Sequence, residues 1–253
     1  MENTLIMALH QDLRRKLSNI KAACTEIWDN QEMKHYTRHG IEHSENIIRI
    51  LSLLLHDMST MKVKLSEHEL FILLASAYLH DIGMQSAYHA DIPDKAEYSF
   101  KDLDTIRENH HVASFKMIFE SIDSKAERSV HCGLQDCREP NYVTFIARLS
   151  KSHRMNRPGI MAKELEDDYL ITGEIIRVRL LVALLRLGDE LDRDYTRVKI
   201  ERLKLWDIPL NSKVHWWIHH YTRAIGIQDG IICPYFRIPL KIVCGVKQKI
   251  YDY

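Results

Sequence analysis

The segment from Ser66 to Gly83 constrains the fold most, because it ends a mostly apolar helix with an imidazole and a carboxylate. Ser66 and Glu69 have the spacing of a capping box, and an apolar run follows over residues 70–79. Gly83 is typical of a helix end. A helix without a polar face must be buried. The pair His80-Asp81 in its last turn is therefore expected to be buried as well.

Burying an imidazole next to a carboxylate costs free energy unless a counter-ion is present. A divalent cation removes that cost, since neutral imidazole and ionised carboxylate are both good ligands. Other predicted helices carry further residues of the same kinds on inward-facing stripes: His43, His110, His153 and Asp189. The sequence therefore predicts a metal site assembled from several helices.

Composition agrees with a mostly helical globular chain of one large domain, with or without a small appendage. The 253 residues are 45% hydrophobic and 28% charged, with few Gly or Pro. A formal net charge of zero argues against a broad nucleic-acid or membrane surface. No apolar run reaches the length of a membrane span. An odd number of cysteines without a CxxC pair indicates free thiols and a cytoplasmic location.

The predicted elements fall into two parts. Helices are expected over residues 4–30, 41–57, 66–83, 104–121, 140–153 and 173–191, with polar loops at 84–103 and 122–139. After Tyr195 the pattern favours about four strands, over residues 198–205, 214–219, 224–227 and 231–238, with a hairpin turn at Gln228-Asp229-Gly230. We therefore predict a helical metal-binding domain over residues 1–195. A β-rich extension over residues 196–253 ends without a closing element, as expected of a fragment.

Three motifs resemble the HD-domain metal-dependent phosphohydrolase superfamily. The run His43-Ser44-Glu45-Asn46-Ile47 is similar to the family's first ligand motif, and His80-Asp81-Ile82-Gly83 is similar to its name-giving pair. Asp189, within LRLGDELD, is similar to the last ligand. The resemblance covers residues 35–195. It implies a mainly α fold, an HD-type helical bundle, here with a small β-rich C-terminal extension.

Further positions concern the branch of this superfamily. His110 and His153 resemble the extra histidines of two-metal members such as cyclic-nucleotide phosphodiesterases and HD-GYP proteins. Ser152-His153-Arg154 stands where HD-GYP proteins have a double histidine, and Gly-Tyr-Pro is missing. The residues around Asp189, with Asp192 and Tyr195 behind it, look more like HD domains found beside Hsp90-like ATPases in bacterial conflict systems. That resemblance implies a fused or associated ATPase module and a role in bacterial defence.

Several assignments have alternatives. A histidine on an apolar helix stripe is commonly a hydrogen-bonded core residue, and for His110 and His153 this interpretation competes evenly with metal binding. His39 precedes His43 by four residues, so it is either another ligand or an exposed residue. His111 is an alternative to His110 as a ligand. The candidates for phosphate contacts are Lys151, Arg154 and Arg186, although an ordinary solvated or salt-bridged surface position is the default interpretation for each of them.

The resemblance implies one or two divalent ions (Mn, Fe, Mg or Zn), with Asp81 as the bridging ligand of a pair. Such ions would activate a water for attack on phosphorus, and His110 or His111 would protonate the leaving oxygen. We therefore expect a phosphohydrolase or phosphodiesterase acting on a nucleotide or cyclic nucleotide. One alternative is a nucleotide-sensing or interaction module that keeps the metal site without catalysis. Another is a structural domain in which the metal only joins helices.

Overall fold

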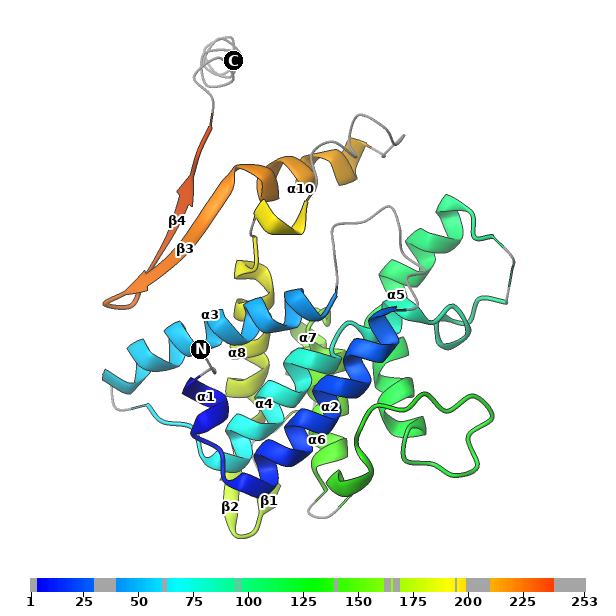
Figure 1. Ribbon diagram of the computed structural model, residues 1–253, viewed down its shortest axis with the longest axis horizontal. Coiled ribbons are helices and arrows are strands. Elements are labelled where there is room, and N and C mark those ends of the chain that lie inside the picture. The colour runs from blue at the N-terminus through cyan, green and yellow to red at the C-terminus, as the bar shows by residue number, and fades with distance from the viewer. Residues whose placement is uncertain are drawn as a thin grey trace. The chain divides into compact units, whose positions relative to one another are not determined.

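The computed structural model describes residues 4–29, 40–60, 63–93, 95, 97–138, 141–161, 165, 169–193, 195–198 and 210–238. The chain divides into two compact units, with the boundary between Asp192 and Arg193. The first unit is mainly helical, and the second contains a helix and a β-hairpin (Figure 1). The fold is therefore mainly α with a small β-containing C-terminal part, which confirms the predicted class.

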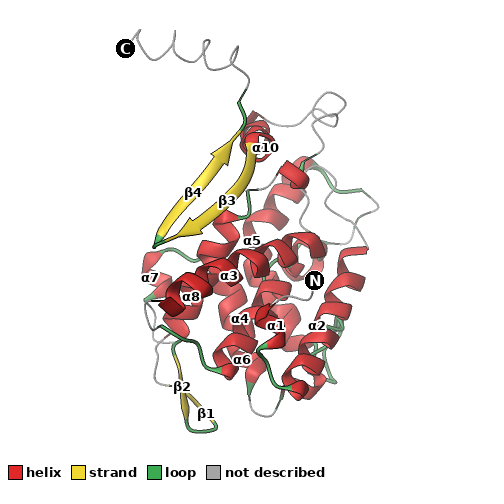
Figure 2. Cartoon of the chain, turned by 60° about the vertical axis from the view of Figure 1, so that its left-hand side comes forward, coloured by secondary structure: helices red, strands yellow, loops and turns green. Residues whose placement is uncertain are grey.

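Helix α4 (Glu67–Leu79) is the centre of the first unit. Leu70 through Leu79 are all buried, as expected from a helix without a polar face. The helices that pack around it are α2 (Gln11–Asp29), α3 (Ile41–Thr60), α6 (Tyr142–Ser152) and α8 (Val178–Leu191) (Figures 1 and 2). The predicted capping box is present, because Ser66 accepts from the backbone of Glu69 and the Glu69 carboxylate accepts from that of Ser66.

The segment after α4 is more ordered than predicted. Two 3₁₀ turns, η1 (Ile82–Gln85) and η2 (Tyr88–Ala90), pack against α5 (Phe100–Glu120). Ala87, Ala90 and Ile92 are buried there. Helix α5 starts four residues earlier than predicted, because Ser99 forms a capping box with Asp102. The polar loop expected at 84–103 is therefore largely packed against the helical unit.

Two helices have bounds that differ from the predicted ones. The helix expected over 4–30 is divided into α1 (Thr4–Met7) and α2, because the backbone N–H of His10 donates to the Glu67 carboxylate instead of a helical carbonyl. The helix expected from 173 begins at Val178. Before it, β1 (Tyr169–Ile171) and β2 (Glu174–Ile176) form an antiparallel hairpin, whose turn residues Thr172 and Gly173 have positive φ angles of 50° and 87°.

The second unit differs most from expectation. Residues 214–219, predicted as a strand, lie in α10 (Leu210–Tyr221). Its helical period brings Trp217 onto Tyr221, with stacked rings 5.6 Å apart. The hairpin of β3 (Thr222–Gln228) and β4 (Ile231–Phe236) is antiparallel and turns at Asp229-Gly230, as predicted. The described part of this unit thus has two strands, whereas most of the strand predicted at 198–205 lies outside the described residues.

The remaining described elements are short: η3 (Gln135–Cys137) in the predicted loop at 122–139, α7 (Arg157–Ile160) after α6, and η5 (Tyr195–Arg197) in the second unit. The described cysteines, Cys24, Cys132, Cys137 and Cys233, are free thiols. Among the described helices, none is long and apolar enough to cross a membrane.

Candidate metal centre

Five elements of the helical unit bring the predicted residues together. Three of these residues lie at or just beyond helix ends: His80 is the C-cap of α4, Asp81 follows it, and His153 is the C-cap of α6. His43 is in the first turn of α3 and His110 is in the middle of α5. These side chains are buried, whereas that of Asp189, near the end of α8, is 30% exposed.

The Asp81 carboxylate lies between two groups of histidines. Its Oδ2 atom is 3.6 Å from Nε2 of His43 and 3.4 Å from Nε2 of His80. Asp189 joins this first group, with its Oδ1 atom 3.3 Å from His43 Nε2 and 3.8 Å from His80 Nε2. Two carboxylates and two imidazoles therefore converge on the Oδ2 side of Asp81.

The Oδ1 atom of Asp81 faces the second group. It lies 2.9 Å from Nε2 of His110 and 3.3 Å from Nε2 of His153. The two Nε2 atoms are themselves 2.8 Å apart. The second group thus consists of two imidazole nitrogens and one carboxylate oxygen within contact distance of one another.

The opposite ring nitrogens show which tautomers are present. Nδ1 of His110 is 2.5 Å from the carbonyl oxygen of Arg107, and Nδ1 of His153 is 2.5 Å from that of Ser150. Because a carbonyl only accepts, each Nδ1 carries the proton and donates it. The Nε2 atoms of the neutral rings then present lone pairs to each other and to Asp81. Such a cluster of acceptors needs a positive charge between them, from a proton or a cation.

The first group is oriented in the same way. His80 directs Nδ1 to the Ala77 carbonyl oxygen at 3.1 Å, and its buried Nε2 has no hydrogen-bond partner of good geometry among the described residues. Nδ1 of His43 is 2.5 Å from Oδ2 of Asp192, a buried carboxylate. The second ring nitrogen of a metal-binding histidine usually makes such a bond, which fixes the ring and its tautomer.

Charge within the cluster shifts several pKa values. Burial alone would lower the pKa of His80, but Asp81 and Asp189 outweigh it and raise the pKa to about 10. Burial would raise the pKa of Asp81, yet the neighbouring imidazoles of His80 and His110 hold it well below its ordinary value. The pKa of Asp189 is likewise low, because the close imidazoles of His43 and His80 outweigh its burial. The cluster thus has two ionised carboxylates that attract a positive charge.

The donor atoms fit a divalent cation. Within the described part of the chain, one possible set of ligands is His43, His80 and Asp81, and another is Asp81, His110 and His153; the donor atoms of each set lie within 4.8 Å of one another. Buried, oriented imidazoles with ionised carboxylates suit transition metals such as manganese, iron or zinc better than magnesium. Both groups could therefore hold a metal ion.

The remaining predicted residues are His39, His111 and the candidates for phosphate contacts. His39 lies outside the described residues. His111 borders the second group, with its ring 6.3 Å from that of His153, and His110 is the one next to Asp81. Burial and the neighbouring imidazoles lower the pKa of His111 to about 4. Arg186, a candidate for phosphate contacts, instead donates to the carbonyl oxygens of Ser152 and Met155, both at 2.7 Å, and so holds the turn that carries His153.

Sequence reasoning assigned no role at the centre to Asp192. This residue follows the last residue of α8, where helical periodicity no longer indicates direction. Its place three residues after Asp189, at the end of the LRLGDELD motif, is the signal that could have indicated it.

A helical unit that buries a His-Asp pair beside further histidines and an aspartate defines an HD domain. The HD-CE family model matches residues 33–238, and the chain belongs to this family. Neither the curated proteins nor the solved structures gave a match.

Proposed function

We propose that the chain is a metal-dependent phosphohydrolase or phosphodiesterase acting on a nucleotide or cyclic nucleotide. The observation that carries this proposal is the position of Asp81 between two groups of imidazoles, with Oδ2 facing one group and Oδ1 the other. Membership of an HD-domain family supports it. We assign one ion to His43, His80, Asp81 and Asp189, and a second to Asp81, His110 and His153.

Divalent ions held by these residues would supply an activated water and would neutralise charge that develops on phosphoryl oxygens. The protein's own contribution is orientation. Backbone carbonyls hold His80, His110 and His153 with Nε2 directed inward. The buried histidine and aspartate side chains also exclude bulk water from one side of the centre, which strengthens electrostatic interactions within it.

His111 is our candidate for the group that contacts the leaving oxygen. It is half-buried and borders His153 without belonging to either group of donors around Asp81. With a pKa near 4 it is neutral at pH 7, so it would donate a hydrogen bond from a neutral ring. His111→Ala is expected to lower kcat while leaving metal content unchanged.

The test combines metal analysis with turnover. Wild-type protein and Asp81→Asn are analysed by ICP-MS after loading with Mn²⁺, and then assayed with linear and cyclic nucleotides. We expect about two metal equivalents in the wild type, and loss of metal and activity in Asp81→Asn. Asp91→Asn is the matched control, because Asp91 is exposed and pairs with Lys116. Unchanged metal content and turnover in Asp81→Asn would refute the proposal.

One observation favours a second candidate function, a nucleotide-binding module without catalysis. The low pKa of His111 means that this residue carries no acidic imidazolium near neutral pH. A binding module would retain a nucleotide tightly and give no product over hours in the same assay. Product formation that depends on metal would exclude it.

A further inference from the structure

A small pocket of about 260 Å³ lies between α5 and α6. Phe115 and Phe119 of α5 form one side of it, and Arg148 and Lys151 of α6 contribute the other. Residues that follow α6 complete the lining: Met155 and Leu165. The pocket thus combines an aromatic wall with two cationic side chains, within the helical unit.

This pocket adjoins the second group of imidazoles. Phe115 follows His111 by four residues on α5, so the two side chains are neighbours on one face of the helix. Lys151 precedes His153 by two residues and Met155 follows it by two. The His111 ring, 6.3 Å from that of His153, is therefore a neighbour of both the second group and Phe115.

The lining suits an aromatic anion. The rings of Phe115 and Phe119 are both half-buried and meet edge to face, 4.8 Å apart, which leaves aromatic surface toward the pocket. The ammonium group of Lys151 lies 5.0 Å from the centre of the Phe115 ring and forms no ion pair with a described carboxylate. A planar base can stack on such rings, and a lysine of this kind can bind a phosphate.

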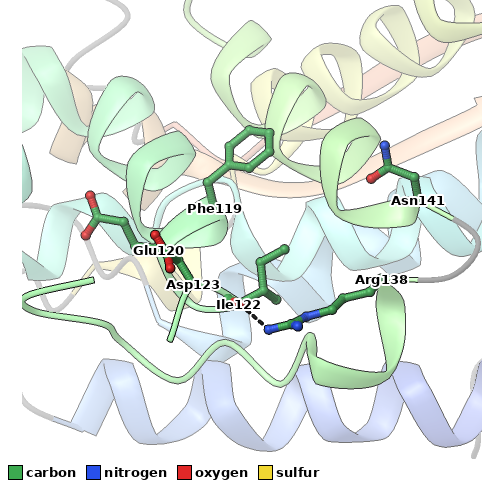
Figure 3. Close-up of a pocket in the computed structure, with 6 residues that line it drawn as sticks. All are labelled: Phe119, Glu120, Ile122, Asp123, Arg138 and Asn141. Atoms are coloured by element: carbon green, nitrogen blue, oxygen red, sulfur yellow. Dashed lines mark hydrogen bonds between the residues drawn. The ribbon is translucent and has the colours of Figure 1, made fainter. Parts of the chain in front are cut away.

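The neighbouring pocket on the other side of Phe119 has a different chemistry. It measures about 570 Å³ and is lined in part by the acidic residues Glu120 and Asp123 (Figure 3). Arg138, its cationic residue, already donates to the Ile122 carbonyl oxygen (Figure 3). The two acidic residues in its lining make it unsuitable for an anion, although it is larger.

We propose that the pocket of Phe115, Phe119, Arg148 and Lys151 binds the part of the substrate that is not cleaved. The base stacks on one ring of this aromatic wall, and a phosphate other than the scissile one contacts Lys151 and Arg148. The inference rests on the proposed function and narrows its substrate class to nucleotides with at least two phosphates.

Binding of hydrolysis-resistant probes tests this assignment. Calorimetry on the Mn²⁺-loaded protein compares α,β-methylene ADP and its guanosine counterpart with methylenediphosphonate, which has no base. Phe115→Leu should weaken nucleotide binding about tenfold and leave methylenediphosphonate unaffected, because the change removes the ring and keeps an apolar side chain. Lys151→Met should weaken both kinds of probe, whereas Lys151→Arg should preserve binding. Lys101→Met is the surface control, on an exposed position of α5.

Equal affinity for the nucleotides and the base-free probe in the wild type would overturn the inference. So would unchanged nucleotide binding in Phe115→Leu, or no binding of any probe. Metal content and hydrolysis of bis(p-nitrophenyl) phosphate are measured on the same samples. Binding that follows the expected pattern without hydrolysis would refute the proposed catalysis and retain the pocket. Hydrolysis without probe binding would retain the proposed catalysis and refute the pocket.

Discussion

At the scale of single residues, Asp192 determines which nitrogen of His43 can bind a cation. Its Oδ2 atom is 2.5 Å from Nδ1, which leaves Nε2 directed toward Asp81 and Asp189. We expect Asp192→Leu to weaken metal binding by roughly 10–100-fold, a typical cost of losing such a partner. Asp192→Asn should cost less, since its amide oxygen still accepts from Nδ1. Titration with Mn²⁺ followed by EPR measures the metal affinity of the wild type and of both variants. Equal affinities in all three proteins would contradict this role of Asp192.

The second prediction at this scale concerns protons. The raised pKa of His80, about 10, means that the metal-free centre carries a proton there at pH 7.5. A cation bound at the first group must displace it, so metal binding should release at least one proton and tighten as the pH rises toward 10. His153 should release none, because burial lowers its pKa and it is already neutral. Calorimetry in buffers of different ionisation enthalpy counts the protons, and an enthalpy independent of buffer would contradict the expectation.

The sequence indicated most of the candidate centre because helical periodicity shows which side chains face inward. This reasoning places His43, His110 and Asp189 correctly beside the His80-Asp81 pair. It could not choose between His110 and His111, since both lie on stripes with apolar residues. That choice depends on how α5 packs, through long-range contacts that periodicity does not reveal.

At the scale of elements, Gly83 lets the turn after α4 approach α5. A Cβ atom there would lie 2.5 Å from the backbone nitrogen of Ser114 and 2.7 Å from Cβ of Ala113. The turn is also joined to α5 by Ser114, which accepts from the Gly83 N–H and donates to the His80 carbonyl. We expect Gly83→Ala to lower the free energy of unfolding by about 3 kcal/mol, since backbone atoms cannot move away cheaply.

Urea unfolding of metal-free protein checks this value. Gly173→Ala is the comparison, because an added Cβ there meets nothing within 4 Å. Its positive φ of 87° should cost only about 1 kcal/mol. A smaller loss in Gly83→Ala than in Gly173→Ala would show that the turn adjusts easily.

Glu69 connects the starts of two helices. Its carboxylate accepts from the Ser66 backbone before α4, and from the backbone and guanidinium of Arg177 before α8. Burial would raise the pKa of Glu69, but these bonds outweigh it and lower the pKa. Glu69→Gln should therefore destabilise by about 3 kcal/mol at pH 7.

The pH dependence follows from the sign of that shift. Because the folded pKa is below the unfolded one, the contribution of Glu69 is complete above the unfolded value and disappears as the pH falls through the folded one. Denaturant unfolding of both proteins between pH 7 and pH 3 should show the difference shrinking toward acid. If the difference in unfolding free energy stays constant over this range, the effect of Glu69→Gln comes from packing and not from charge.

Local sequence patterns predicted an element well where the hydrophobic periodicity and the capping residues at its ends indicate the same structure, as in α4. They failed for α10, because Val214, Trp216 and Ile218 alternate with other residues as in a strand. The burial of Trp216 and His219, three residues apart, shows a helical period instead. They also missed the β1–β2 hairpin, because an apolar run with a Gly near its start suits a strand or a helix equally well.

At the scale of the whole molecule, the candidate metal centre joins five parts of the helical unit. A cation that binds only the folded unit stabilises it by RT ln(1 + [M]/Kd), about 2.7 kcal/mol at a hundredfold excess over Kd. Scanning calorimetry should therefore show a higher Tm with Mn²⁺ than with EDTA. The same comparison on Asp81→Asn is the control. An equal shift in Tm in this variant would show that the stabilising ion binds outside the candidate metal centre.

The burial of α4 also determines which parts of the protein can move. Its amide protons should exchange with solvent only through global unfolding, since neighbouring helices cover the residues from Leu70 to Leu79. His80 and Asp81 therefore remain attached to the slowest-exchanging segment. Any opening that admits a ligand must come from the edges of the unit, such as the 3₁₀ turns at 82–90 or the chain after His153.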